Sequence, residues 1–127
     1  MDAAILKLIN DKSLASVMSN TKWKRLAEGI ASLNPEVRVK YLNDEKPSGF
    51  SHLDWEWVKF GETAFIEWIE IDPIRRIFQG KLIANKEIDL SSDLEIIFRT
   101  ANTPFSREGH LFKVWGYITP SNQPNFV

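Results

Sequence analysis

The sequence contains no cysteine, which excludes a disulfide framework, a cysteine-ligated zinc site and a cysteine nucleophile. It also lacks any apolar run that approaches the roughly 18 residues of a membrane span. Segment 1–18 carries Asp2 early and is interrupted by Lys7 and Asn10, so it lacks the basic start and the unbroken apolar stretch of a signal peptide. We therefore expect a cytoplasmic protein that has no membrane partner.

Signatures of enzymes are missing as well. There is no phosphate-binding loop, no glycine-rich dinucleotide pattern, no nucleophile elbow and no H-E-x-x-H zinc motif. The two histidines, His52 and His110, could meet as an acid/base pair like that of a ribonuclease, which would make the protein a small hydrolase or nuclease. Two exposed turn histidines are the commoner interpretation. We predict a protein that is not an enzyme and that needs no cofactor and no metal ion.

The chain does have the material for one packed core. It has 127 residues, of which 43% are hydrophobic and 12% aromatic, and this suits one domain over residues 1–127. Within that domain we expect segment 1–18 to be a loosely docked N-terminal helix and segment 119–127 to be a polar tail. No internal repeat and no low-complexity tract interrupts the chain.

Two helices are predicted from apolar residues that recur at helical spacing. In the first, Asn20 or Thr21 can cap the free N–H groups, and the helix ends before Pro35. The second begins with Ser92 and Glu95, which match a capping box. The apolar stripes are Trp23, Leu26, Ala27, Ile30 and Leu33 in the first helix, and Leu94, Ile97, Phe98 and Ala101 in the second.

Strand signals dominate the middle and the end of the chain. Residues 36–41 alternate apolar and charged side chains, and residues 53–57 alternate again, with the tryptophans on one side and the two acids on the other. Residues 63–71 are apolar on both faces, which suits a central strand. Residues 111–118 are rich in β-formers and form a last strand. Within residues 74–90, Ile74, Ile77 and Phe78 could form a helical turn, and residues 81–84 after Gly80 could form a short strand.

These signals predict an α+β fold in which a single antiparallel sheet of about four strands has both helices packed on one face. The connections between residues 36 and 71 are too short for crossover helices, so the first three strands should form an antiparallel meander. On the third strand, Glu67 and Glu70 are three positions apart and should point to opposite faces. In that arrangement the two carboxylates cannot act together.

Acidic residues are concentrated in the centre of the chain. Segment 35–72 holds nine acids and four bases, whereas the segments before and after it each carry a small excess of bases. Nucleic-acid binders usually show a basic face, so this distribution disfavours a direct nucleic-acid partner and favours a basic protein. An ordinary solvated face with no partner is the competing interpretation.

Candidate partner-binding residues follow from this distribution. Carboxylates on the turn-rich loop 43–49, on the polar side of residues 53–57 and in the turn after them could meet a basic cleft. An exposed aromatic residue nearby would anchor the partner, although burial beneath a helix is the first expectation for a tryptophan. The acidic candidates are Asp44, Glu45, Asp54, Glu56 and Glu62, and the aromatic candidates are Trp55, Trp57 and Phe50.

Four short motifs give the sequence a resemblance to a known family. They are S-N-T-K-W at residues 19–23, W-I-E-I at 68–71, P-F-S at 104–106 and W-G-Y at 115–117. With them the chain resembles a family of small bacterial proteins classed as a domain of unknown function, over residues 19–118. The resemblance implies no activity and no catalytic residue.

In general type, a small domain with an acidic surface and no catalytic site is similar to the immunity proteins of toxin–immunity systems. An acidic surface can occupy the basic, nucleic-acid-binding cleft of a nuclease toxin and associate with it rapidly. The likeness implies an immunity protein that neutralises a cognate toxin, in particular a nuclease of a contact-dependent inhibition system. The alternative is a regulatory or adaptor protein that has another protein partner.

Overall fold

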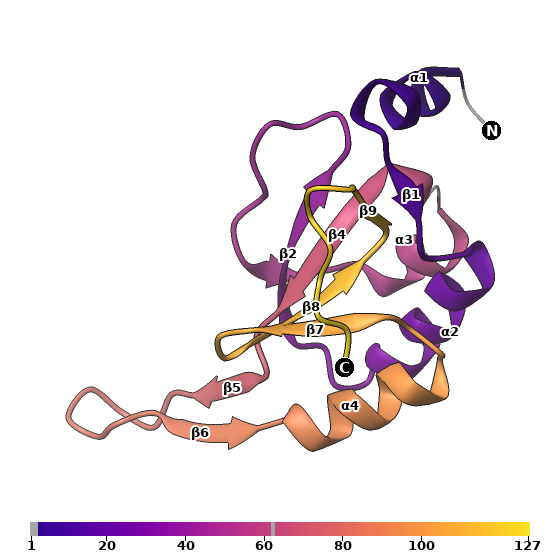
Figure 1. The fold of residues 1–127 in the computed structure, drawn as a ribbon. Coiled ribbons are helices and arrows are strands. Elements are labelled where there is room, and N and C mark those ends of the chain that lie inside the picture. The colour runs from indigo at the N-terminus through magenta and orange to yellow at the C-terminus, as the bar shows by residue number, and fades with distance from the viewer. Residues whose placement is uncertain (1–2, 62) are drawn as a thin grey trace.

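The computed structural model describes residues 3–61 and 63–127 of the chain. Its centre is a five-stranded antiparallel sheet in the order β3-β2-β4-β8-β7 (Figure 1). Two small sheets accompany it, one formed by β1 and β9 and the other by β5 and β6. The central strands are β2 (Glu36–Tyr41), β3 (Ser51–His52), β4 (Ile66–Ile71), β7 (Phe105–Glu108) and β8 (Leu111–Trp115). The other strands are β1 (Ala15–Ser16), β5 (Ile74–Ile77), β6 (Lys86–Asp89) and β9 (Tyr117–Ile118).

Helices α2 and α4 cover one face of the central sheet (Figure 1). There they bury Leu26, Ile30 and Phe98 against Val39 and Ile69 of the sheet. The α+β class and the antiparallel pairing are confirmed, but the chain has several sheets, so the prediction of a single sheet of about four strands is wrong in that detail. The helices are α1 (Ala3–Lys12), α2 (Asn20–Ile30), α3 (Trp55–Phe60) and α4 (Ser91–Thr100), and the 3-10 helix η1 (Thr63–Phe65) precedes β4.

The N-terminal segment packs around a second, smaller core. Ile5 and Leu14 are buried together with Leu42 and Tyr117. The ammonium group of Lys12 donates a 2.9 Å hydrogen bond to the carbonyl oxygen of Leu42, and β1 pairs with β9. The described part of this segment is therefore fixed at several points, whereas the sequence predicted only loose docking.

The last residues of the chain lie along the free edge of β7. The backbone N–H of Val127 donates a 2.9 Å hydrogen bond to the carbonyl oxygen of Phe105. Phe126 forms an antiparallel bridge with Ser106. The segment predicted to be a polar tail thus extends the sheet at this edge.

One strand prediction is confirmed, a second strand starts later than predicted, and the predicted last strand is divided. β2 buries Val37 and Val39, as the alternation of its residues indicates. β4 is the middle strand of the central sheet, although η1 takes the first three residues of the predicted strand. The last strand divides at Gly116 into β8 and β9. The chain there passes so close to Ile66 that a Cβ atom on residue 116 would lie 2.2 Å from the carbonyl oxygen of Ile66, and glycine avoids this clash.

Residues 53–57 form no strand, because α3 begins at Trp55 and includes the last three of them. The carboxylate of Asp54 caps this helix, since its Oδ1 accepts hydrogen bonds of 3.1 and 3.3 Å from two backbone N–H groups of the first turn. Trp55 and Val58 then face the core at the i, i+3 spacing of a helix. The predicted meander is also wrong, because β4 pairs directly with β2 and β3 lies on the other side of β2.

The cap of α2 lies one residue before the predicted ones. The hydroxyl of Ser19 accepts a 3.2 Å hydrogen bond from the backbone N–H of Lys22, so Ser19 is the N-cap and neither Asn20 nor Thr21 has this role. The helix itself is confirmed. Its buried residues belong to the predicted apolar stripe and are Trp23, Leu26, Ala27 and Ile30.

Helix α4 is confirmed too, but the predicted capping box is wrong. The helix begins at Ser91 after Leu90, which makes no side-chain cap hydrogen bond, so Ser92 lies inside the first turn. The carboxylate of Asp89 accepts a 2.9 Å hydrogen bond from the N–H of Ser91 instead. Hydrogen bonding with Ser91, first from its side chain and then from its backbone N–H, lowers the pKa of Asp89 below its ordinary value.

We expect Ser19→Ala to lower the free energy of unfolding by about 1 kcal/mol, because one backbone donor at the start of α2 would lose its protein acceptor. Ser92→Ala is the matched control. It makes the same change in a first turn that its hydroxyl does not cap, and should change the stability by less than about 0.5 kcal/mol. Urea unfolding of both variants measures the difference. Equal losses for the two variants would contradict this assignment of the caps.

A register shift in β4 reorients its acids. The ladder between β2 and β4 slips by one residue at Glu67, which breaks the alternation of the strand. Glu67 then forms an ion pair with Lys40 at 3.8 Å, and Glu70 forms one with Arg38. Lys40 and Arg38 are alternate residues of β2 and share one face. Glu67 and Glu70 therefore lie on the same face of the sheet, contrary to the prediction.

Residues 74–89 form a hairpin of β5 and β6, and Leu90 then precedes α4. Residues 74–77, which one interpretation gave to a helical turn, form strand β5. Residues 81–84, which the other gave to a strand, lie in the connection between β5 and β6. We call residues 74–89 the arm, because this hairpin projects from the body of the molecule (Figure 1).

Candidate functional site

Several predicted partner-binding residues reach the solvent around α3. Trp57 is 39% exposed and packs edge-on against Tyr41, with ring centroids 6.4 Å apart and ring planes at 76°. Phe60, one turn further along α3, is 72% exposed. Asp44 lines a hollow together with the rings of Tyr41 and Trp57. The exposed Glu56 precedes Trp57 in the chain. We call Tyr41, Asp44, Glu56, Trp57 and Phe60 the α3 surface.

The hollow of the α3 surface has a volume of about 530 Å³. Aromatic rings and polar groups line it together, so it can accept an apolar side chain next to a basic one. Burial, and after it the negative charge of Asp44, raise the pKa of Tyr41 above its ordinary value. The hydroxyl of Tyr41 therefore stays protonated at neutral pH and can donate a hydrogen bond to a partner. The lining residues are Tyr41, Asn43, Asp44, Trp57, Gly61 and Phe65.

One base at the edge of the α3 surface is already engaged. The ammonium group of Lys59 lies 3.7 Å from the carboxylate of Glu28 and 5.2 Å from the ring centroid of Phe60. Its charge is thus partly balanced within the chain.

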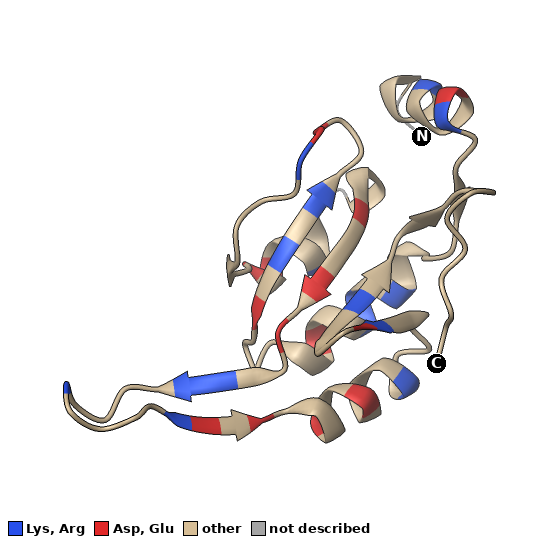
Figure 2. Cartoon of the chain, turned by 60° about the vertical axis from the view of Figure 1, so that its left-hand side comes forward, with Lys and Arg blue, Asp and Glu red and all other residues tan. Residues whose placement is uncertain are grey.

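Figure 2 shows acidic and basic bands side by side on the loop between β2 and β3, which contributes Asp44 to the α3 surface.

The acidic candidates lie in different environments. Asp44, Glu45 and Glu56 are exposed, so their carboxylates can approach a partner. Asp54 is exposed as well, but its carboxylate is occupied as the N-cap of α3. Glu62 lies outside the described residues. The structure therefore places Asp44 and Glu56 in the α3 surface and assigns a structural role to Asp54.

The aromatic candidates separate in the same way. Trp55 is only 5% exposed and belongs to the core. Phe50 is 40% exposed, but its ring lies 5.1 Å from the guanidinium carbon of Arg38 and thus belongs to the other face of the sheet. Sequence reasoning missed Phe60. Its signal was the i, i+3 spacing from Trp57, which indicates a common face only if the segment is taken as a helix.

The face of the central sheet opposite α2 and α4 carries a layer of paired charges. Glu70 is 6% exposed, and its Oε1 accepts hydrogen bonds of 2.8 and 2.5 Å from Arg38. Lys113 of β8 pairs in register with Glu70, and its ammonium group lies 4.1 and 4.2 Å from the ring centroids of Trp68 and Trp115. Burial lowers the pKa of Lys113, and the charge of Glu70 opposes that shift.

This layer suits stabilisation of the sheet better than chemistry. Figure 2 shows the bases of β2 beside the acids of β4, and ion pairs join the two strands. The indole N–H of Trp115 donates a 2.9 Å hydrogen bond to the hydroxyl of Ser106, which is itself hydrogen-bonded to Glu108. Charges that already have opposite charges or rings as neighbours can hold their strands in register.

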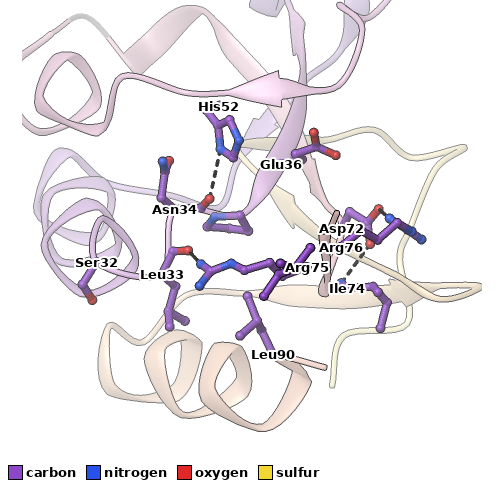
Figure 3. Close-up of a pocket in the computed structure, with 12 residues that line it drawn as sticks. Ser32, Leu33, Asn34, Glu36, His52, Asp72, Ile74, Arg75, Arg76 and Leu90 are labelled. Atoms are coloured by element: carbon purple, nitrogen blue, oxygen red, sulfur yellow. Dashed lines mark hydrogen bonds and ion pairs between the residues drawn. The ribbon is translucent and has the colours of Figure 1, made fainter. Parts of the chain in front are cut away.

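His52 lines a second hollow, of about 520 Å³, at the base of the arm (Figure 3). Its Nδ1 lies 3.0 Å from the carbonyl oxygen of Asn34. The guanidinium of Arg75 donates a hydrogen bond to the backbone carbonyl oxygen of Leu33. The guanidinium of Arg76 lies 3.1 Å from the carboxylate of Asp72. The polar groups of this hollow are thus largely engaged with one another, and we assign no ligand to it.

The two histidines do not meet. His52 belongs to β3, at one edge of the central sheet, and His110 lies in the turn between β7 and β8. β3 and β8 are three positions apart in the strand order, which is about 14 Å at ordinary strand spacing. Direct proton transfer needs hydrogen-bond distance. The structure therefore does not form the acid/base pair on which the hydrolase or nuclease alternative depends.

Among residues 3–61 and 63–127, no three histidine, aspartate or glutamate side chains converge where they could hold a metal ion. In the same two ranges, no helix has the length and the apolar character needed to cross a membrane.

A protein-family model matches residues 5–121, and its description is a family of unknown function, DUF6678. The matched residues include the central sheet, the arm and the α3 surface. No curated protein matches the chain, and no solved structure matches it either.

Proposed function

We propose that this chain, which belongs to the family of unknown function DUF6678, is an immunity protein that binds and neutralises a cognate toxin through the α3 surface. The observation that carries the proposal is the half-exposed ring of Trp57, which lines a hollow together with Tyr41 and Asp44. Large aromatic residues at the centre of a contact supply much of the energy of protein interfaces. The partner we expect is a basic protein, in particular a nuclease of a contact-dependent inhibition system, met in the cytoplasm.

The acids around these rings support a basic partner. Asp44, Glu45 and Glu56 are exposed and belong to the segment in which acids outnumber bases. A nuclease holds the phosphates of its substrate with lysine and arginine side chains, so its cleft attracts carboxylates from a distance. Carboxylates would steer the encounter, and the ring of Trp57 would slow the separation.

An adaptor protein with a different basic partner would use the same surface, so the identity of the partner separates the two functions. An immunity gene follows the gene of its toxin, and the neighbouring upstream gene therefore supplies the protein to test. Binding of that protein, together with protection of cells that express it, supports the immunity function. Binding of an unrelated cellular protein alone supports the adaptor function.

The test uses the double charge reversal Asp44→Lys, Glu56→Lys. We expect its association with the toxin to be about tenfold slower or more at low salt. The difference should shrink as salt is added, because the Debye length falls to about 8 Å at physiological ionic strength. Stopped-flow measurements across a salt series give both the rate and its salt dependence. Asp54 is left unchanged, because its carboxylate caps α3.

The matched control is Asp11→Lys, Asp93→Lys, which makes the same change of charge at two exposed acids outside the α3 surface. It should lose much less of the association rate, since steering depends on where the charge lies as well as on the total charge. If the α3 double variant associates like the wild type at every salt concentration, its acids are an ordinary solvated face and the proposed surface is wrong.

A further inference from the structure

The turn of the arm presents three large apolar side chains to the solvent. Phe78 is 73% exposed, Leu82 is 101% and Ile83 is 60%. Figure 1 shows the arm projecting from the body of the molecule. A two-stranded hairpin gains little stability from its own contacts, and a group of exposed apolar side chains marks a contact surface. We call these three residues the arm tip.

The surroundings of the arm tip are basic. No acid occurs between Asp72 and Glu87, and Arg76 pairs with those two acids. Lys81 and Lys86 form no ion pair with any other residue that the structure describes. Figure 2 shows a basic band at the end of the arm. A surface that covers the arm tip should therefore combine apolar groups with carboxylates.

The α3 surface of the same chain has this composition. Trp57 and Phe60 supply exposed rings, and Asp44 and Glu56 supply exposed carboxylates, with the exposed Glu45 next to Asp44 in the chain. The hollow of about 530 Å³, which Tyr41, Asp44 and Trp57 help to line, has room for a leucine or an isoleucine side chain. The two surfaces are thus complementary in apolar character and in charge.

These two surfaces lie at opposite ends of β2. Its first residue, Glu36, lines the hollow at the base of the arm together with Ile74, and its last residue, Tyr41, lines the hollow of the α3 surface. A strand of this length spans about 17–20 Å, and the arm points away from the body (Figure 1). The arm tip therefore does not reach the α3 surface of its own chain. Two copies placed side by side in opposite directions would bring each arm tip to the α3 surface of the other.

We propose that a second copy of this chain covers the arm tip, so that two copies form a dimer with each arm tip on the α3 surface of the other. The arrangement is closed and two-fold, which limits the assembly to two copies. It deepens the proposed function, because the toxin and the second copy compete for the α3 surface. The dimer keeps the exposed aromatic rings covered until the partner displaces the arm.

Sedimentation of the purified chain in the absence of toxin tests the proposal. We expect the wild type to dimerise as its concentration rises and to dissociate as salt is added. Leu82→Asp should weaken dimerisation by at least about tenfold, and its side chain is fully exposed, so the fold should be unaffected. Ile96→Asp is the matched control, because it makes the same kind of change at a residue of α4 that is 63% exposed. It should dimerise like the wild type.

A charge swap tests which surface receives the arm. Lys81→Glu and Asp44→Lys should each weaken the dimer, and the chain that carries both changes should recover at least part of the loss, because the two new charges attract across the interface. A double variant that is weaker than both single variants would show that the arm does not meet the α3 surface, and would overturn the proposal.

A wild-type chain that stays monomeric at all concentrations, or a Leu82→Asp chain that dimerises like the wild type, also overturns it. Vesicles that contain phosphatidylserine test the other occupant of an apolar and basic tip, an anionic bilayer. If a monomeric wild type sediments with these vesicles and Leu82→Asp does not, the arm binds membranes and the dimer is refuted. These measurements need no toxin, so failure of the dimer and failure of the proposed function are separate results.

Discussion

Glu70→Ala should lower the free energy of unfolding by about 2–4 kcal/mol, because it leaves the guanidinium of Arg38 without its carboxylate in the charged layer of the sheet. The Glu70 side chain is 8% exposed and that of Arg38 is 34% exposed. Water can therefore reach Arg38 in the variant, and the loss should stay below that of a fully buried pair. Lys113, which pairs in register with Glu70, loses the same negative neighbour. The melting temperature should fall by roughly 10 °C.

Glu28→Ala is the comparison for this prediction. Glu28 forms an ion pair of 3.7 Å with Lys59, but its side chain is 47% exposed. Removing a carboxylate from such a pair should cost less than about 1 kcal/mol. Urea unfolding of Glu70→Ala and Glu28→Ala under the same conditions compares them directly. Similar small losses would mean that the charged layer does not stabilise the sheet.

The sequence was sufficient where the burial pattern is local. The alternation of residues 36–41 predicts which side of β2 is buried, and the apolar stripe from Trp23 to Ile30 predicts the inner side of α2. These patterns depend only on the period of the element itself. Both elements were predicted from their own residues.

The sequence was insufficient where pairing between distant segments decides the geometry. The side of the sheet on which Glu67 lies depends on a slip in the ladder between β2 and β4. At the same residue, the backbone N–H of Gly116 donates a hydrogen bond to the carbonyl oxygen of Glu67. Counting positions along β4 alone puts Glu67 on the wrong face. The sheet order that separates His52 from His110 likewise depends on how the strands pair.

The candidate site was predicted in part. The distribution of charge located Asp44 and Glu56 correctly on the surface. It could not show that Trp55 is buried while Trp57 is exposed. Residues two positions apart share a face in a strand, but they lie on nearly opposite sides of a helix. The cap at Asp54 decides between these alternatives, and an alternation of five residues was too short to reveal it.

The second large effect is expected at Trp57. Trp57→Ala should accelerate dissociation from the toxin by about 30-fold or more, because a central aromatic anchor typically contributes at least about 2 kcal/mol to binding. The association rate should change much less, since affinity differences between related complexes arise mainly in dissociation. Surface plasmon resonance with immobilised toxin measures both rates.

Phe50→Ala is the matched control for Trp57→Ala. The two side chains are 40% and 39% exposed, but Phe50 stacks on Arg38 on the other face of the sheet. Its loss should leave the dissociation rate close to that of the wild type. If Phe50→Ala accelerates dissociation and Trp57→Ala does not, the partner binds the charged face of the sheet and not the α3 surface.

The decisive measurement is hydrogen exchange with and without the toxin in the Leu82→Asp chain, whose α3 surface is not covered by a second copy. Backbone amides that a partner covers exchange more slowly, and the slowing shows which segments the partner contacts. We expect slower exchange in α3 and in the loop that carries Asp44, with little change in α4. Protection confined to α4, or an unchanged exchange rate throughout α3 in a saturated complex, would contradict it.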